Sequence, residues 1–274
     1  MRSSGVSILD AVLLAILQGF TEFLPVSSSG HLVLGQQLLS LHNPQLLTFD
    51  VFVHFGTLIS VVVIFWTDII GMLDSFFKVL GTFKFKEEYK SSEHYRLGVS
   101  ILLGSIPAGV IGLAYHHQVE EAFTDPKLVA MNLVITGLIL FLTRLAKPVE
   151  GKRIGIVSAI IIGFAQAVAI LPGISRSGST ISTALYLKHS PVQGARFSFL
   201  LSVPVIAGAA LLEGYQLLKH GTTIGWAPIL AGTVVSAIAG YIAIKLLLRI
   251  IEKGKFSWFA FYCLAIGTLG IIFI

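Results

Sequence analysis

Two stretches of the chain decide its fold: LPVSSSGH at residues 24–31 and LPGISRSGST at residues 171–180. Each interrupts an apolar region, 6–41 and 154–187, so that every half is shorter than the roughly 20 residues that a membrane span needs. Both stretches share the order leucine, proline, aliphatic residue and Ser-x-Ser-Gly, with one glycine added in the second. The similarity predicts an internal repeat of two broken helices, and chance similarity between short serine–glycine breaks is the alternative.

Six further apolar runs indicate membrane-spanning helices. The chain has 274 residues, of which 55% are hydrophobic and 12% are charged, about half the charge of a soluble domain. This composition excludes an ordinary soluble protein and a disordered chain. The single cysteine, Cys263, excludes an internal disulfide and a cysteine-based metal site. The expected spans are about 51–66, 97–115, 127–143, 197–214, 229–247 and 257–274.

The distribution of basic residues predicts how these elements cross the bilayer. Of the 19 lysines and arginines, 14 lie in one set of connections, whereas only Arg2, Lys127 and Lys219 lie on the opposite side of the membrane. This asymmetry holds only if each interrupted region enters and leaves the membrane on the same side. The positive-inside rule then places the basic set in the cytoplasm and both termini outside. The connections that hold the 14 basic residues are 67–96, 144–153, 188–196 and 249–255.

We therefore expect an all-α polytopic membrane protein with six transmembrane helices and two re-entrant helical hairpins in an inverted-topology repeat. It forms a single integral membrane domain over residues 1–274, with a first repeat of about 6–143 and a second of about 154–274. The net charge of +5 follows from topology, so no nucleic-acid partner is expected. The start of segment 67–96 is either an interfacial helix or a solvated loop.

Each break can bind an anion. Pro25 and Pro172 end the first half-helices, and the following serines can cap the second ones, whose free N–H groups attract phosphate. Two such N-termini facing each other suit a diphosphate. The expected substrate-binding residues are Gln18, Ser27, Ser29, Gly30, Ser175, Ser177, Gly178 and Thr180.

Two charges stand in apolar surroundings, where a charge costs about 2.5–3.5 kcal/mol. The planar fork of Arg176 suits phosphate oxygens, and a structural arginine that pairs with Glu22 or with carbonyls is the alternative. Glu22 is either a base, a ligand for Mg²⁺ or Ca²⁺, or a protonated structural residue.

Ser28 and His31 complete the expected catalytic group. Either could attack phosphorus, with His31 or Glu22 accepting the proton of Ser28. His54 is a weaker candidate on a different span. The other histidines considered, at connections, need no function: His116, His117, His189 and His220.

The motifs from Gln18 to His31 and from Leu171 to Thr180 resemble those of the bacterial undecaprenyl-diphosphate phosphatase family, the BacA type linked to bacitracin resistance. The resemblance covers nearly the whole chain. It implies hydrolysis of undecaprenyl diphosphate to the monophosphate and phosphate, which recycles the lipid carrier for cell-wall synthesis. The family allows glutamate or glutamine at position 18, so Gln18 leaves Glu22 as the one carboxylate of that pair and puts a two-carboxylate metal site in doubt.

The resemblance also implies roles and surroundings. Glu22 corresponds to the essential acid, Ser28 and His31 to the candidate serine and histidine, and Arg176 to the phosphate-binding arginine. The expected partners are a polyprenyl diphosphate and membrane lipids, with a homodimer also considered. The expected location is the bacterial inner membrane, with the active site open to the outer face.

Two other functions compete with this interpretation. A type-2 phosphatidate phosphatase is similar in its Ser-Gly-His and Ser-Arg pairs, but no histidine follows Arg176 at the required spacing. A lipid-phosphate flippase or secondary transporter has the same inverted-repeat architecture. Glu22, Ser28, His31 and Arg176 together favour reaction chemistry over transport alone.

Overall fold

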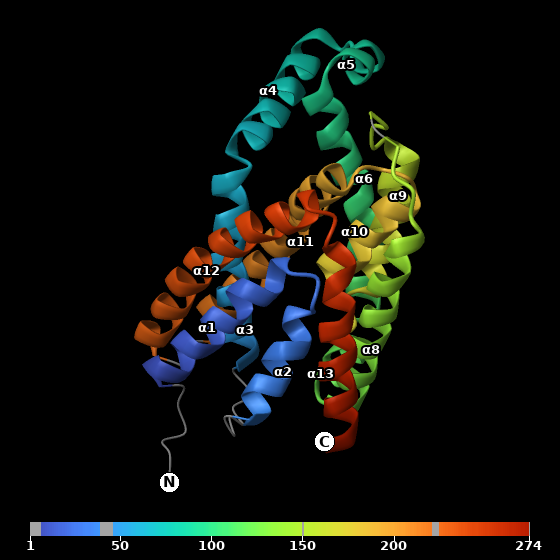
Figure 1. Ribbon diagram of the computed structural model, residues 1–274. Helices are drawn as coiled ribbons and strands as arrows, with labels where there is room; N and C mark the ends of the chain where they lie inside the picture. Colours follow the sequence, from blue (N-terminus) through green and yellow to red (C-terminus); the bar gives the residue numbers. More distant parts are fainter. Residues whose placement is uncertain (1–6, 39–45, 150, 221–224, 274) are drawn as a thin grey trace.

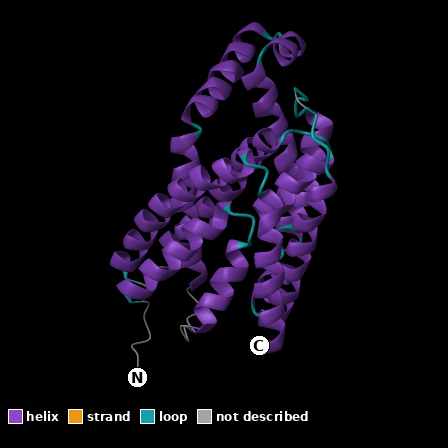
Figure 2. Ribbon diagram, viewed as in Figure 1, coloured by secondary structure: helices purple, strands orange, loops and turns teal. Residues whose placement is uncertain are grey.

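The computed structural model describes residues 7–38, 46–149, 151–220 and 225–273, and within these residues the secondary structure is helical, with the helices joined by loops and turns (Figure 2). Arg2 and the outermost ends of the region 6–41 lie outside these residues, as does residue 274. The helices are α1 (Ile8–Phe23), α2 (Ser28–Leu38), α3 (Leu46–Ile64), α4 (Trp66–Thr82), α5 (Phe85–Ser91), α6 (Glu93–Ala114), α7 (His116–Phe123), α8 (Pro126–Leu142), α9 (Ile156–Val168), α10 (Arg176–Tyr186), α11 (Pro191–His220), α12 (Trp226–Glu252) and α13 (Phe259–Phe273).

Five of the described helices are long and apolar enough to cross a bilayer, and α3 with α4 makes a sixth candidate that bends by 78°. The five are α6, α8, α11, α12 and α13, each of which overlaps an expected span. The protein is therefore a multi-pass membrane protein. Of the two alternatives for the start of segment 67–96, the structure has a helix, α4, which runs with α5 to the top of the view in Figure 1.

The two interrupted regions form the helix pairs α1–α2 and α9–α10, whose members pack against each other (Figure 1). Ser27 has a φ of 67° and Gly173 has a φ of 89°, so at both breaks the chain turns sharply through left-handed backbone. The second helices begin at Ser28, directly after Ser27, and at Arg176, three residues after Gly173.

Side chains of α8 satisfy the backbone of the second break. Asn132 Nδ2 donates to the carbonyl of Pro172 at 2.8 Å, and Thr136 Oγ1 donates to the carbonyl of Gly173 at 2.9 Å. The same Thr136 oxygen accepts from the N–H of Ser175 at 3.0 Å. These bonds supply partners that a bilayer interior does not offer.

The two breaks also contact each other. Ser177 Oγ donates to the carbonyl of Leu24 at 3.2 Å. A Cβ built on Gly30 would lie 3.3 Å from the Cα of Gly173, so glycine permits this approach. Residues more than 140 positions apart in the sequence thus form one polar centre.

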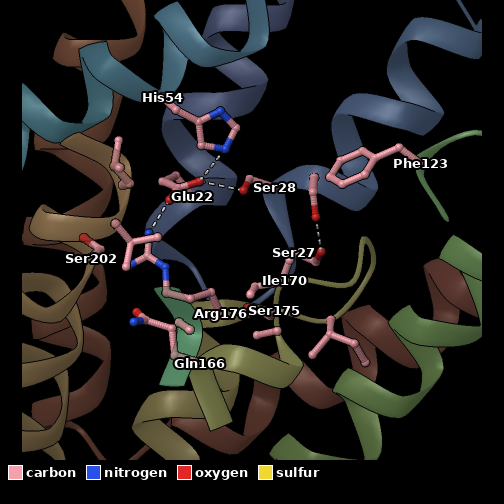
Figure 3. Close-up of a pocket in the computed structure, with 16 residues that line it drawn as sticks. Glu22, Ser27, Ser28, His54, Phe123, Gln166, Ile170, Ser175, Arg176 and Ser202 are labelled. Carbon is pink, nitrogen blue, oxygen red and sulfur yellow. Dashed lines mark hydrogen bonds and ion pairs between the residues drawn. The ribbon is translucent and has the colours of Figure 1, made fainter. Parts of the chain in front are cut away.

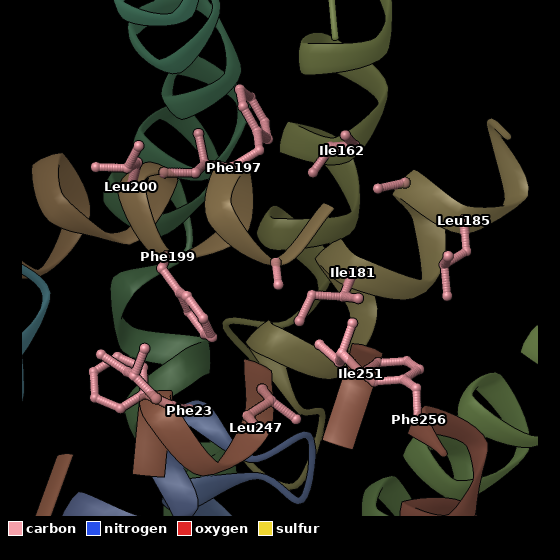
Figure 4. Close-up of a cluster of buried hydrophobic side chains, with 14 of the residues drawn as sticks. Phe23, Ile162, Ile181, Leu185, Phe197, Phe199, Leu200, Leu247, Ile251 and Phe256 are labelled. Carbon is pink, nitrogen blue, oxygen red and sulfur yellow. The ribbon is translucent and has the colours of Figure 1, made fainter. Parts of the chain in front are cut away.

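Buried apolar side chains hold this centre in place (Figure 4). Phe23, next to Glu22, packs edge-on against Phe199 of α11 with ring centroids 5.4 Å apart. Leu247 and Ile251 of α12 belong to the same cluster. The end of α1, which carries Glu22 and Phe23, is therefore held in place by the hydrophobic core.

The basic connections meet at one end of the molecule. Contacts join the segments around residues 68, 144–153, 188–196 and 257, which border or contain the four basic connections. The contacts are Arg196 Nε with Asp68 Oδ2 (3.1 Å), Val149 N with Lys188 O (2.9 Å), and Arg144 Nε with Ser257 Oγ (3.4 Å).

We predict that Thr136→Val destabilises the protein. The substitution keeps the shape of the side chain but leaves the carbonyl of Gly173 and the N–H of Ser175 buried without Thr136, at about 1–3 kcal/mol for each unpaired group. Thr57→Val is the matched control, because Thr57 is equally buried but bonds only to its own helix. Thermal unfolding in detergent measures both, and equal melting temperatures for the two variants would contradict the assigned role.

Candidate active site

A cavity of about 200 Å³ lies where the two breaks meet (Figure 3). Both breaks line it, together with residues of α3, α6, α7, α9 and α11. The lining has an apolar part, which includes Phe123 and Ile170, and a polar part. The polar lining residues are Glu22, Ser27, Ser28, Ser29, His54, Gln166, Ser175, Arg176 and Ser202.

Glu22 is the centre of the polar contacts. Gln18, one turn earlier on α1, donates through Nε2 to Glu22 Oε2 at 2.9 Å. Ser28 Oγ donates to the same oxygen at 2.6 Å, and His54 Nε2 lies 3.4 Å from it. Arg176 Nη2 pairs with the other oxygen, Oε1. These partners compensate a charge that apolar surroundings otherwise disfavour.

Arg176 links the two breaks, since it begins α10 and pairs with the end of α1. Its Nη1 is buried and has no hydrogen-bond partner in the described part of the chain. A guanidinium with one nitrogen held by Glu22 and another unpartnered at a cavity can donate a hydrogen bond to a phosphate oxygen in a fixed geometry. The pairing with Glu22 considered from the sequence is present, and it leaves this nitrogen available.

The N-termini of α2 and α10 both reach the cavity, with Ser28 and Arg176 as first residues. Ser27 Oγ accepts from the N–H of Gly30 at 3.3 Å, and Ser175 Oγ accepts from the N–H of Gly178 at 3.0 Å. These two serines therefore cap the half-helices. Ser28 differs, because its hydroxyl is bonded to the carboxylate of Glu22.

Half of the residues expected from the sequence do not line the cavity. Gln18 reaches it only through Glu22. Ser177 bonds to the other break, and Thr180 bonds to Ser198 of α11 at 2.6 Å. These positions project from other faces of the half-helices than Arg176. The expected residues outside the lining are Gln18, Gly30, His31, Ser177, Gly178 and Thr180.

His31 points away from the cavity. Its Nδ1 lies 2.8 Å from the carbonyl of Ser27, and its Nε2 lies 2.9 Å from the hydroxyl of Tyr262 on α13. The two rings stack with centroids 5.6 Å apart. His31 thus braces the first break against α13, and the structure does not bring it together with Glu22, Ser28 and Arg176.

Three polar residues at the cavity were missing from the expected site or given little weight. His54, the weaker candidate, lies directly at Glu22 (Figure 3). Gln166 has both side-chain polar atoms buried and without partners among the described residues. Its place shortly before the second proline–serine break, matching the place of Gln18 before the first, is the signal in the sequence. Ser202, within an apolar run, gave no such signal.

The chain matches a sequence profile of the family described as bacitracin resistance protein BacA over residues 11–269. It belongs to the BacA family. Proteins named undecaprenyl-diphosphatase are 40% identical in Salinibacter ruber, over 96% of this chain and 97% of the relative, and 43% identical in Halothermothrix orenii, over 97% of both. One from Bacteroides fragilis is 39% identical over 96% of this chain and 97% of the relative. The BacA resemblance inferred from the two serine motifs is confirmed.

We predict that a thiol at position 28 is reachable from the cavity whereas one at position 180 is not. Ser28→Cys should react with a small water-soluble methanethiosulfonate, measured by intact mass. Thr180→Cys should stay unmodified because Thr180 is fully buried. The native Cys263 is also buried and serves as an internal control. Equal labelling of both variants would contradict the cavity described above.

Proposed function

We propose that this protein hydrolyses undecaprenyl diphosphate to undecaprenyl phosphate and inorganic phosphate. The relatives named undecaprenyl-diphosphatase cover nearly all of the chain. The observation that assigns the reaction to particular residues is the hydrogen bond from Ser28 Oγ to Glu22 Oε2 at 2.6 Å, in the cavity that Arg176 also lines. None of the relatives reported above is named a transporter, so nothing there favours the flippase alternative.

The proposed reaction begins with Ser28. Its Oγ attacks the terminal phosphorus while Glu22 accepts the hydroxyl proton. The new bond between Oγ and phosphorus forms as the bond from phosphorus to the bridging oxygen breaks, and undecaprenyl phosphate leaves with that oxygen. Water then displaces the serine, inorganic phosphate is released, and the proton on Glu22 returns to Ser28.

In this proposal Arg176 and the half-helix N-termini stabilise the negative charge on the phosphate oxygens. The unpartnered Nη1 of Arg176 binds a phosphate oxygen, and the N-termini of α2 and α10 add positive dipole ends. The remaining lining is apolar, which suits the polyprenyl chain at the membrane midplane. Membrane lipids surround the rest of the protein.

A divalent cation, expected from the oxygen ligands to be Mg²⁺ or Ca²⁺, fits at Glu22. The donors at the cavity are the carboxylate and the Ser28 hydroxyl. Gln18 Oε1, which is buried without a hydrogen-bond partner in the described residues, adds a third oxygen when the side-chain amide is turned so that Oε1 rather than Nε2 faces Glu22. Oxygen donors combined with substrate phosphates are the usual surroundings of such cations. When bound, the cation neutralises charge on the diphosphate.

The finer topology is part of the proposal. We infer six spans and two re-entrant hairpins, α1–α2 and α9–α10, whose helices of 11–16 residues are each too short to cross. The packing supports an inverted repeat, because α1 lies along α12 of the second half while α9 lies along α6 of the first. A homodimer stays a prediction.

The proposed location is the bacterial inner membrane with the site open to the outer face. The connections rich in lysine and arginine meet at one end, which the positive-inside rule assigns to the cytoplasm. Phe123 of α7, a connection in the opposite set, lines the cavity. This supports an opening toward the outer side.

We expect Ser28→Ala to lower phosphate release from undecaprenyl diphosphate by at least about 10²-fold. Arg176→Lys keeps the charge beside Glu22 but loses the planar fork, and should fall similarly. Ser105→Ala is the control, because Ser105 bonds only to its own helix carbonyl at 2.8 Å. Phosphate release is measured on purified protein in detergent. Near-normal rates in both active-site variants would refute the assigned roles.

We predict that an impermeant thiol reagent added to intact cells labels Glu121→Cys on α7. The same reagent should leave Lys86→Cys and Lys147→Cys unlabelled until the cells are opened, because those positions lie in the basic connections. All three side chains are exposed, so burial does not explain a difference. Labelling of residue 86 or 147 from outside would reverse the proposed orientation.

A further inference from the structure

We propose that His54 is a metal ligand, and that with Glu22 it forms a mixed nitrogen–oxygen site that prefers Mn²⁺ and similar transition ions over Mg²⁺ and Ca²⁺. The inference rests on the proposed function only for the presence of a cation in this cavity. It adds a ligand from α3, outside both serine motifs. It also changes which ion the site selects.

The spacing of the two side chains fits a shared ion. His54 Nε2 and Glu22 Oε2 are 3.4 Å apart and point toward one another from α3 and α1 (Figure 3). Ligand atoms at about 2.1 Å from one ion are themselves about 3.0–3.4 Å apart at octahedral and tetrahedral angles. The observed separation therefore fits coordination of one ion by both atoms.

The other ring nitrogen of His54 is oriented as in metal-binding histidines. Nδ1 lies 2.7 Å from the backbone carbonyl of Asp50, which only accepts, so Nδ1 carries a proton. In the neutral ring, the lone pair of Nε2 then faces the Glu22 carboxylate. A cation between them removes this repulsion, and a backbone carbonyl behind the ring is the common second partner of a ligating histidine.

Gln18 provides an independent observation. Its Oε1 is buried without a hydrogen-bond partner among the described residues, although its Nε2 bonds to Glu22 at 2.9 Å. Rotation of the amide exchanges these two atoms and turns the oxygen toward the same ion. An amide oxygen is a weak ligand, and the imidazole nitrogen of His54 adds a stronger donor beside the carboxylate of Glu22.

The nitrogen donor decides the selectivity. Mg²⁺ and Ca²⁺ bind almost entirely to oxygen, whereas imidazole favours transition ions. A site with Glu22, Gln18 and His54 should therefore bind Mn²⁺ more tightly than Mg²⁺. Replacing the imidazole by an amide restores an all-oxygen set.

A second group of ligands on the surface must be removed before the test. His116, His117 and Glu120 on α7 are exposed, and their ligand atoms lie within 4.8 Å of one another. They can bind the same probe ions. The test therefore uses the full-length His116→Ala/His117→Ala protein as parent.

The experiment measures Mn²⁺ bound to the purified parent by electron spin-echo envelope modulation, which detects directly coordinated ¹⁴N. We expect a ¹⁴N coupling in the parent that disappears in His54→Gln, with Mn²⁺ affinity reduced at least about tenfold. His54→Ala should give the same loss. Monodisperse elution and unchanged circular dichroism verify folding of each variant.

Competition with Mg²⁺ gives a second readout. The parent should need at least about tenfold more Mg²⁺ than His54→Gln to displace half of the Mn²⁺. A parent without ¹⁴N coupling, or a coupling that persists in both His54 variants, overturns the proposal and leaves His54 as a side-chain contact of Glu22 without a metal. Phosphate release is assayed separately, so nitrogen coupling in an inactive parent would refute only the proposed reaction.

Discussion

The ion pair between Glu22 and Arg176 sets the constraint that the rest of the fold meets. Each charge stands among apolar helices, where an unpaired ion costs several kcal/mol, so the two must be held in contact. They belong to half-helices far apart in the sequence. The packing of α1 on α12 and of α9 on α6 brings these ends together.

A second constraint is the backbone of the breaks themselves. A chain that leaves helical geometry inside a bilayer exposes polar groups that lipid does not satisfy. Thr136 and Asn132 on α8 bond to the second break, and Ser27 and Ser175 cap the helices that follow the two breaks. The result is two fixed helix N-termini at one cavity, before any substrate enters.

The same arrangement explains how a charged lipid head can react within hydrocarbon. The charges of Arg176 and Glu22 offset each other in the cavity. An incoming diphosphate can bind the unpartnered guanidinium nitrogen of Arg176 while Glu22 accepts the hydroxyl proton of Ser28. His54 approaches Glu22 from a third helix. The proposed cation site therefore depends on the position of α3 as well as on the two breaks.

The features that could be predicted from the amino-acid sequence are local ones. The proline and serine breaks, the long apolar helices and the family followed from residues within a few positions of each other, and Glu22, Ser28 and Arg176 belong to those motifs. Which side chains share the cavity depends on how the helices pack. His31 turns to Tyr262 and Thr180 to Ser198, whereas His54, Gln166 and Ser202 come in from other helices. The reason is that spacing along a helix fixes relative faces, but only packing fixes which face meets the site.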